Sequence, residues 1–207
     1  MDTSKNPKVF TANVNRYDKY SIAQFLTQFT VGKSSKNEDE EAMEQENEEE
    51  TKPSGVIQGY TVYGTLDEGI KHAPDFVNII AVDEKRENFI EKVMQCDCII
   101  YNIKDDYKAI DDALWILEKL HDNLDNFAAQ KQFILISSVL TWAKSSLPDP
   151  NDPEMPFTDD DYLRRKAHSN YEEHILAEKS VIQQGKTVSK MYSYSNNNNN
   201  VVIVILE

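Results

Sequence analysis

Two adjacent hydroxyls, Ser137 and Ser138, end the apolar run "KQFILISS". An apolar run of this length is typical of a buried strand. A serine at the end of such a strand has two alternative roles. It can hydrogen-bond nearby backbone groups and finish the strand. Alternatively, Ser138 can be a catalytic hydroxyl, with Tyr171 or Tyr162 as the acid that completes the site.

A tyrosine–lysine pair follows in "YLRRK", where Tyr162 and Lys166 lie four residues apart. On a helix this spacing places both side chains on one face. The lysine charge would then lower the pKa of the phenol and favour general-acid chemistry. Such a spacing is common by chance, so it is weak evidence. The longer helical segment "NYEEHILAEK" supplies two further candidates, Tyr171 and His174.

Apolar runs of strand length alternate with helical stripes along the chain. Strands are predicted at 8–14, 56–64, 96–103 and 131–138, and helices at 21–29, 86–96, 105–127 and 170–185. This alternation predicts an α/β fold with a doubly wound, mainly parallel, Rossmann-like sheet. Strands 8–14 and 96–103 are expected to lie side by side at its centre. Any site would be formed by loops at the carboxyl ends of the strands.

A dinucleotide site in this fold needs a glycine-rich turn after the first strand, so that backbone amides can reach a pyrophosphate. Here the turn is "NVNRYDKYS", residues 13–21, which has no glycine. The segment "YNIK" after strand 96–103 also lacks small residues. We therefore expect no cofactor. The crevice is predicted to be narrowed by four side chains: Arg16, Tyr17, Tyr20 and Tyr101.

The alternative is an NAD(P)-dependent reductase with an atypical cofactor loop. In that case Arg16 and Lys19 would grip the phosphate in place of backbone amides, since an arginine can bind a phosphate through two nitrogens.

Net charge limits the partners. The chain of 207 residues has a net charge of −14, which disfavours nucleic acid and anionic membrane as partners. Its two cysteines, Cys96 and Cys98, are too close to bridge each other comfortably and too few for a zinc site. The longest apolar run, "VVIVIL" at 201–206, is too short to span a bilayer. A cytoplasmic protein is expected.

The domain organisation follows from composition. Residues 8–187 are predicted to form one Rossmann-like domain. It is interrupted by an insert at 34–54, whose acidic run holds nine of the 36 acidic residues and is expected to be disordered. Residues 188–207 form a low-complexity tail with five asparagines and a possible last strand. The fold is expected to be incomplete at its C-terminus.

The order of elements, the serine-ending fifth strand and the "AE" on the last helix resemble the extended short-chain dehydrogenase/reductase (SDR) fold. The resemblance implies a catalytic tyrosine and lysine just before "AE". Counting back from Ala177 places His174 at the lysine position and Asn170 at the tyrosine position. Ser138, Tyr171 and His174 are therefore predicted to be vestiges of a site and not catalytic residues.

A closer resemblance covers residues 8 to 187 and is carried by "TWAKS", "DPNDPEMPFT" and "DYLRRK". These segments resemble the N-terminal, SDR-like region of the long, cilium-associated adenylate kinases of the isoenzyme-seven type. The resemblance implies a ciliary or flagellar axoneme as the setting and a module with no established reaction. It also implies that phosphoryl transfer belongs to a separate kinase domain.

That kinase domain is absent here, because no P-loop is found. The nearest segment, "SVIQQGKT" at 180–187, has Ser180 in place of the first glycine. The leading hypothesis is therefore a non-catalytic or vestigial module that binds a protein partner. A fragment that inherits only the kinase name is a further alternative. No metal site is expected.

Overall fold

The computed structural model describes residues 6–28, 30–31, 57–67, 69–70, 72–81, 86–192 and 201–206. Its main sheet has the strand order β5-β4-β1-β6-β7-β8, and all its pairings are parallel. This is the Rossmann order, which confirms the predicted fold class and the adjacency of the two central strands. The strands are β1 (Lys8–Thr11), β4 (Thr61–Gly64), β5 (Asn78–Ile79), β6 (Cys98–Asn102), β7 (Gln132–Ser137) and β8 (Val201–Leu206).

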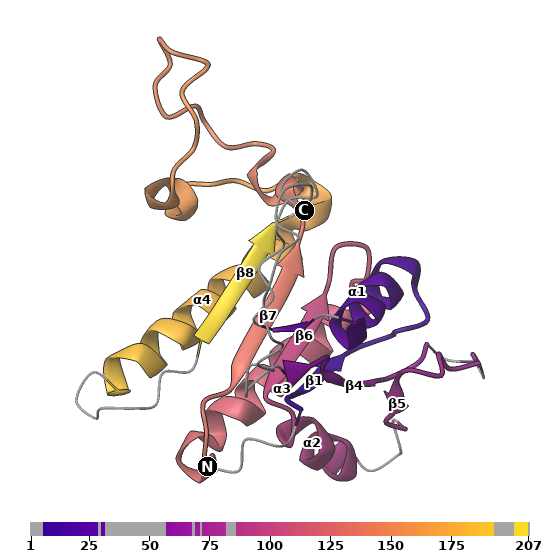
Figure 1. Ribbon diagram of the computed structural model, residues 1–207. Helices are drawn as coiled ribbons and strands as arrows, with labels where there is room; N and C mark the ends of the chain where they lie inside the picture. The colour runs from indigo at the N-terminus through magenta and orange to yellow at the C-terminus, as the bar shows by residue number, and fades with distance from the viewer. Residues whose placement is uncertain are drawn as a thin grey trace, which may run out of the picture.

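Helices cover both faces of this sheet (Figure 1). Helix α1 (Tyr17–Gln28) covers one face, whereas α2 (Arg86–Met94), α3 (Lys108–Asp122) and α4 (Glu172–Tyr192) cover the other. Side chains alternate along a strand. Accordingly, Ile99 packs with α2, α3 and α4, while Ile100 belongs to the core on the opposite face. A strand buried on both faces is apolar throughout, as the central strands are.

The predicted strand 56–64 is two strands, which corrects its boundary. Its first part, β3 (Ile57–Gln58), pairs antiparallel with β2 (Thr30–Val31) outside the main sheet. The break falls at Gly59, whose φ of +72° turns the chain. Only glycine fits there, because a Cβ would lie 2.3 Å from the carbonyl oxygen of Thr27.

Other boundaries shift by a few residues. Helix α4 was predicted to end at Gly185 but continues to Tyr192. It is preceded by the 3-10 helix η4 (Ser169–Tyr171), which His168 caps. Thr158 forms a capping box with Asp161 at the 3-10 helix η3 (Asp159–Leu163). Strand β5 was not predicted, because two residues carry no periodicity.

The acidic segment 34–54, predicted to be disordered, lies outside the described residues. So do residues 193–200 of the tail, which include the five asparagines. The tail's apolar end forms β8, which pairs with β7 over six residues from Gln132↔Val201 to Ser137↔Leu206.

Cys96 and Cys98 are free, and burial raises the pKa of their thiols to about 11 and about 12 respectively. Both are therefore neutral near pH 7.

Gly64, at the end of β4, lets the turn after β1 press against the neighbouring strand. A Cβ at this position would lie 2.5 Å from Val14 Cγ1 and 2.8 Å from the Thr11 carbonyl oxygen. We expect Gly64→Ala to lower the free energy of unfolding by about 1–3 kcal/mol, because the added methyl overpacks a closed contact. Urea unfolding measures this. The control is Gly69→Ala, which meets no atom within 4 Å, although its positive φ adds some strain; a smaller loss at Gly64 than at Gly69 would contradict the prediction.

Candidate functional site

The candidate site lies where the strand order reverses, between the carboxyl ends of β1 and β6. In doubly wound folds ligands bind in this crevice, with the phosphates at the turn after the first strand. The turn here comprises residues 12–16, and the loop after β6 comprises residues 103–107. These two loops, together with residues 65–67 after β4, decide whether a nucleotide can enter.

The turn after β1 uses its backbone amides internally. The Asn13 N–H donates to Thr65 Oγ1 at 3.0 Å, and the Val14 N–H donates to the Thr65 carbonyl at 2.9 Å. Asn13 has a φ of +53°, a conformation that asparagine tolerates. The Arg16 N–H donates back to the Asn13 carbonyl at 3.1 Å. Amides with these partners are not available to cradle a phosphate.

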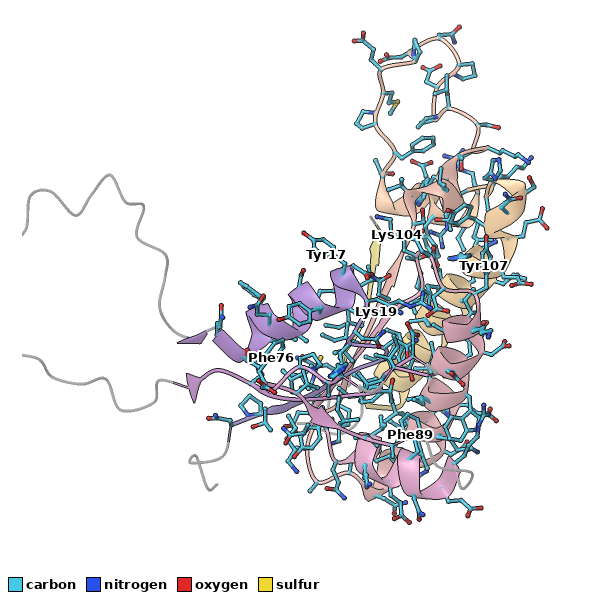
Figure 2. The ribbon with its side chains drawn as sticks, turned by 90° about the vertical axis from the view of Figure 1, so that its right-hand side faces the viewer. Tyr17, Lys19, Phe76, Phe89, Lys104 and Tyr107 are labelled. Atoms are coloured by element: carbon cyan, nitrogen blue, oxygen red, sulfur yellow. The ribbon has the colours of Figure 1, made fainter. Side chains whose placement is uncertain are left out.

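A carboxylate of the chain itself, Asp106, lies in the crevice. Its Oδ2 accepts from Lys19 Nζ at 3.2 Å and from Asn13 Nδ2 at 3.2 Å, and Arg16 Nη1 lies 3.4 Å away. Its Oδ1 accepts from the Ala109 N–H at the start of α3. Lys19 is only 2% exposed (Figure 2 shows it inside the fold). The cations Lys19 and Arg16 are thus both paired with an anion of the chain itself.

Electrostatics keep Asp106 ionised. Burial by itself would raise the pKa of this carboxyl, but the charges and hydrogen bonds of Lys19, Arg16 and Asn13 outweigh burial and hold the pKa below its ordinary value. A pyrophosphate in this place would meet a permanent negative charge. It would also have to separate a buried ion pair, which leaves one charge uncompensated.

Arg16, the residue predicted to bind a cofactor phosphate in the reductase alternative, contacts a second carboxylate, Asp67. Its Nε donates to Asp67 Oδ2 at 2.9 Å, and this hydrogen bond, with the nearby carboxylates, raises the pKa of the guanidinium. Asn15 holds Asp67 further, through its amide nitrogen and its carbonyl oxygen. Arg16 therefore bridges two carboxylates, one from the loop after β4 and one from the loop after β6.

The tyrosines predicted to narrow the crevice lie elsewhere, which is a correction. Tyr17 is 89% exposed and projects away from α1 (Figure 2). Tyr20 packs against Phe76, with ring centroids 5.2 Å apart. Tyr101 is buried in the core that faces α2 and α3, stacked on Phe133. Its side chain points to the other face of β6 because strand residues alternate. Of the four predicted residues, only Arg16 lies in the crevice.

The two serines at the end of β7 have separate roles. The Ser137 hydroxyl donates to Glu178 Oε1 at 2.5 Å, and both side chains are completely buried. Ser138 Oγ accepts from the Leu140 N–H at 3.3 Å and caps the 3-10 helix η2 (Val139–Trp142). The backbone-capping role proposed for a strand-end serine thus describes Ser138, while Ser137 anchors α4 to the sheet.

Glu178 forms the centre of a buried ionic cluster. Its Oε2 pairs with Arg165 Nη1, and Thr141 Oγ1 lies 3.5 Å from the same oxygen. The Arg165 side chain is 2% exposed and lies over the Trp142 ring, 5.5 Å from its centroid. The cluster joins β7, α4 and the loop before η4. Because its acid, base and hydroxyl are all engaged with one another, we assign it a structural role.

Three residues were predicted to be vestiges of a catalytic site. Tyr171 and His174 contact each other, whereas the Ser138 hydroxyl accepts from the Leu140 N–H two residues further along the chain. The rings of Tyr171 and His174 lie 4.8 Å apart, and Tyr107 contacts His174 edge-on at 5.0 Å. His174 Nε2 donates to the Ile103 carbonyl at 2.8 Å and so links α4 to the end of β6. That Ser138, Tyr171 and His174 are vestiges of a site stays a prediction.

Two sequence patterns prove to be coincidental. Tyr162 lies in η3, which ends at Leu163, so Lys166 does not share a helical face with it. The segment 185–187 of "QGKT" lies within α4. A P-loop requires these residues in a loop between a strand and a helix, with free amides. Neither pattern therefore marks a site.

Sequence reasoning missed Asp106 and the pair of Arg165 and Glu178. A signal for Asp106 existed, because "KDD" follows directly on an apolar strand and so lies at the carboxyl edge of the sheet. Among the described residues, no group of three His, Cys, Asp or Glu side chains is arranged to hold a metal ion. Within the same part of the chain, no helix is long and apolar enough to cross a membrane.

Comparison with known proteins gives one relative by sequence. Mouse (Mus musculus) adenylate kinase 7 is 46% identical over 101 residues, which are 49% of this chain and 16% of that protein. The chain thus matches only a small part of its relative. No protein-family profile matches the chain.

A structural comparison identifies vestitone reductase from alfalfa (Medicago sativa). The TM-score is 0.50 at 16% identity, and the match covers 96% of this chain and 56% of the reductase. At this identity the likeness shows the fold alone. The chain is therefore similar to adenylate kinase 7 over these 101 residues, and its fold is an α/β Rossmann-like fold.

Proposed function

We propose that this chain is a non-catalytic Rossmann module that binds a protein partner. The observation that carries the proposal is Asp106, a carboxylate of the chain that is held by Lys19, Arg16 and Asn13 at the place of a cofactor phosphate. A scaffold whose ligand crevice is filled by its own ion pairs retains a stable fold and an outer surface. Fold by itself does not imply chemistry.

The reductase alternative finds less support. It needs Arg16 and Lys19 to bind a phosphate, yet both cations already have carboxylate partners. It also needs a lysine at the position of His174, which is buried and bonded to the Ile103 carbonyl. A hydride transfer would require a cofactor that this crevice does not favour. We therefore propose that no NAD(P) is bound.

Phosphoryl transfer is not proposed for this segment. In an adenylate kinase, catalysis depends on amides, a lysine and a metal that position the γ-phosphoryl group. The segment with the nearest resemblance to a phosphate loop is helical. We therefore do not assign to this segment the phosphoryl transfer that the relative's name describes.

The setting we propose is a ciliary or flagellar axoneme in the cytoplasm, with a protein of that assembly as the partner. Support comes from the homology to adenylate kinase 7 and from the earlier resemblance to its cilium-associated family. The net charge of −14 repels nucleic acid and anionic membranes, so neither is proposed as a partner.

Titration calorimetry with NADPH tests the closed crevice. We expect no binding tighter than about 100 µM, because the phosphates must displace Asp106 from its cations. NAD, ATP and AMP should likewise leave the melting temperature unchanged, whereas a ligand at 100 times its Kd would add about 2.7 kcal/mol of stability.

Arg16→Ala is the matched variant for this titration. Tighter NADPH binding that disappears in Arg16→Ala would show that the site has been rebuilt around an arginine. The reductase alternative would then replace the proposal.

A further inference from the structure

A protruding arm, residues 145–158, leaves the fold at the carboxyl edge of the sheet. It connects η2 to η3 and extends away from the sheet in both views (Figures 1 and 2). The crevice residues described above lie outside it, and it adds no residue to the hydrophobic core clusters of the described chain. An element of this kind needs a reason other than stability.

The base of the arm is held firmly. The Lys144 N–H donates to the Lys166 carbonyl at 2.9 Å, and the Lys166 N–H donates to Ser145 Oγ at 2.9 Å. Phe157, at the returning end, packs on Trp142 with ring centroids 5.2 Å apart. Arg165 covers the same tryptophan ring. The buried cluster at Glu178 thus fixes the direction in which the arm projects.

The tip of the arm is ordered by its own hydrogen bonds. Asp149 Oδ1 accepts from the Asn151 N–H at 2.8 Å, and the Met155 N–H donates to the Asp152 carbonyl at 3.2 Å. Four of the seven prolines lie in the arm and restrict its backbone. A loop that is preformed in this way loses less conformational entropy when it binds.

The surface of the arm combines exposed apolar side chains with negative charge. Leu147 is 44% exposed, Met155 45% and Phe157 41%. The arm has no lysine or arginine, and it has three acidic residues: Asp149, Asp152 and Glu154. Apolar anchors surrounded by charges of one sign are typical of a binding surface for an oppositely charged partner.

We infer that the arm is the docking element of this module and that it binds a protein surface with an apolar groove flanked by lysine and arginine. The inference rests on the proposed function and specifies its partner. A second copy of the chain is a poor occupant, because a net charge of −14 makes two copies repel each other. The observation that supports this inference is that the tip of the arm carries acidic and exposed apolar side chains and is held in one conformation by its own hydrogen bonds.

The test selects peptides from a random library displayed on phage against the intact chain, with no prior choice of partner. We expect the selected peptides to combine lysine and arginine with apolar residues. Their binding should weaken about tenfold or more in the triple variant Asp149→Lys, Asp152→Lys, Glu154→Lys, because three charges that attract the peptide become charges that repel it. It should weaken similarly in Leu147→Ser with Met155→Ser.

A matched control distinguishes the effect of charges on the arm from the effect of the chain's net charge. The variant Glu48→Lys, Glu49→Lys, Glu50→Lys changes the net charge by the same amount within the acidic run, and binding should change less than about twofold. Equal losses in the two triple variants, or acidic selected peptides, would overturn the inference. So would concentration-dependent dimers in sedimentation that dissociate in the arm variants. The result is independent of NADPH titration, so each proposal can fail separately.

Discussion

Glu178→Gln is expected to lower the free energy of unfolding by about 3–5 kcal/mol. Glutamine keeps an oxygen that can accept from the Ser137 hydroxyl, so the substitution removes mainly the charge. Arg165 is then left buried without a counter-charge, and its Nε and Nη2 already lack a hydrogen-bond partner among the described residues. Chemical unfolding followed by circular dichroism measures the loss.

Glu172→Gln is the control, since Glu172 is exposed in the first turn of the same helix. Its effect should stay within about 0.5 kcal/mol. The double variant Arg165→Met with Glu178→Gln should recover part of the loss, because it also removes the uncompensated cation. If the two single losses simply add in the double variant, the charges do not interact and the assigned cluster is wrong.

The second large effect is expected from Asp106→Asn. Asparagine has one side-chain oxygen, so it can keep the bond from the Ala109 N–H or the contact with Lys19 but not both, and Lys19 loses its buried counter-charge. We expect a loss of about 3 kcal/mol. Removal of the Asp106 charge also leaves Lys19 and Arg16 free to bind an anion from solution. Sulfate should therefore recover more stability in Asp106→Asn than in the unsubstituted chain at equal ionic strength.

Asp112→Asn, in the helix α3 that follows Asp106, is the control. Asp112 forms an exposed ion pair with Arg86 at 3.3 Å, of a kind worth less than about 1 kcal/mol.

The pH dependence of the Asp106 contribution to stability has a definite sign. Because the pKa of Asp106 is lowered in the folded state, its stabilisation is present above the ordinary carboxylate range and is lost as the pH falls below about 4. If the stability difference between the unsubstituted chain and Asp106→Asn grew as the pH fell, the ion pair assigned to Asp106 would be wrong.

The sequence by itself determined the fold and the absence of a glycine-rich phosphate turn. Runs such as "CIIYNI" are apolar on both alternating faces, and only a strand covered on two sides accommodates that pattern. The lack of glycine between residues 13 and 21 is equally direct, because backbone approach to a phosphate is a local steric requirement. Local patterns of this kind can be recognised without knowing what lies nearby in space.

The tertiary structure alone decided what fills the crevice and what the two serines do. Asp106 meets Lys19 across 87 residues, and Ser137 meets Glu178 across 41. Spacing along a chain carries no information about such contacts. The predicted tyrosines failed for the same reason: Tyr101 shares a strand with Asn102, but alternation places their side chains on opposite faces of the sheet. Charges that are buried together are paired by the fold, because an isolated charge cannot remain there.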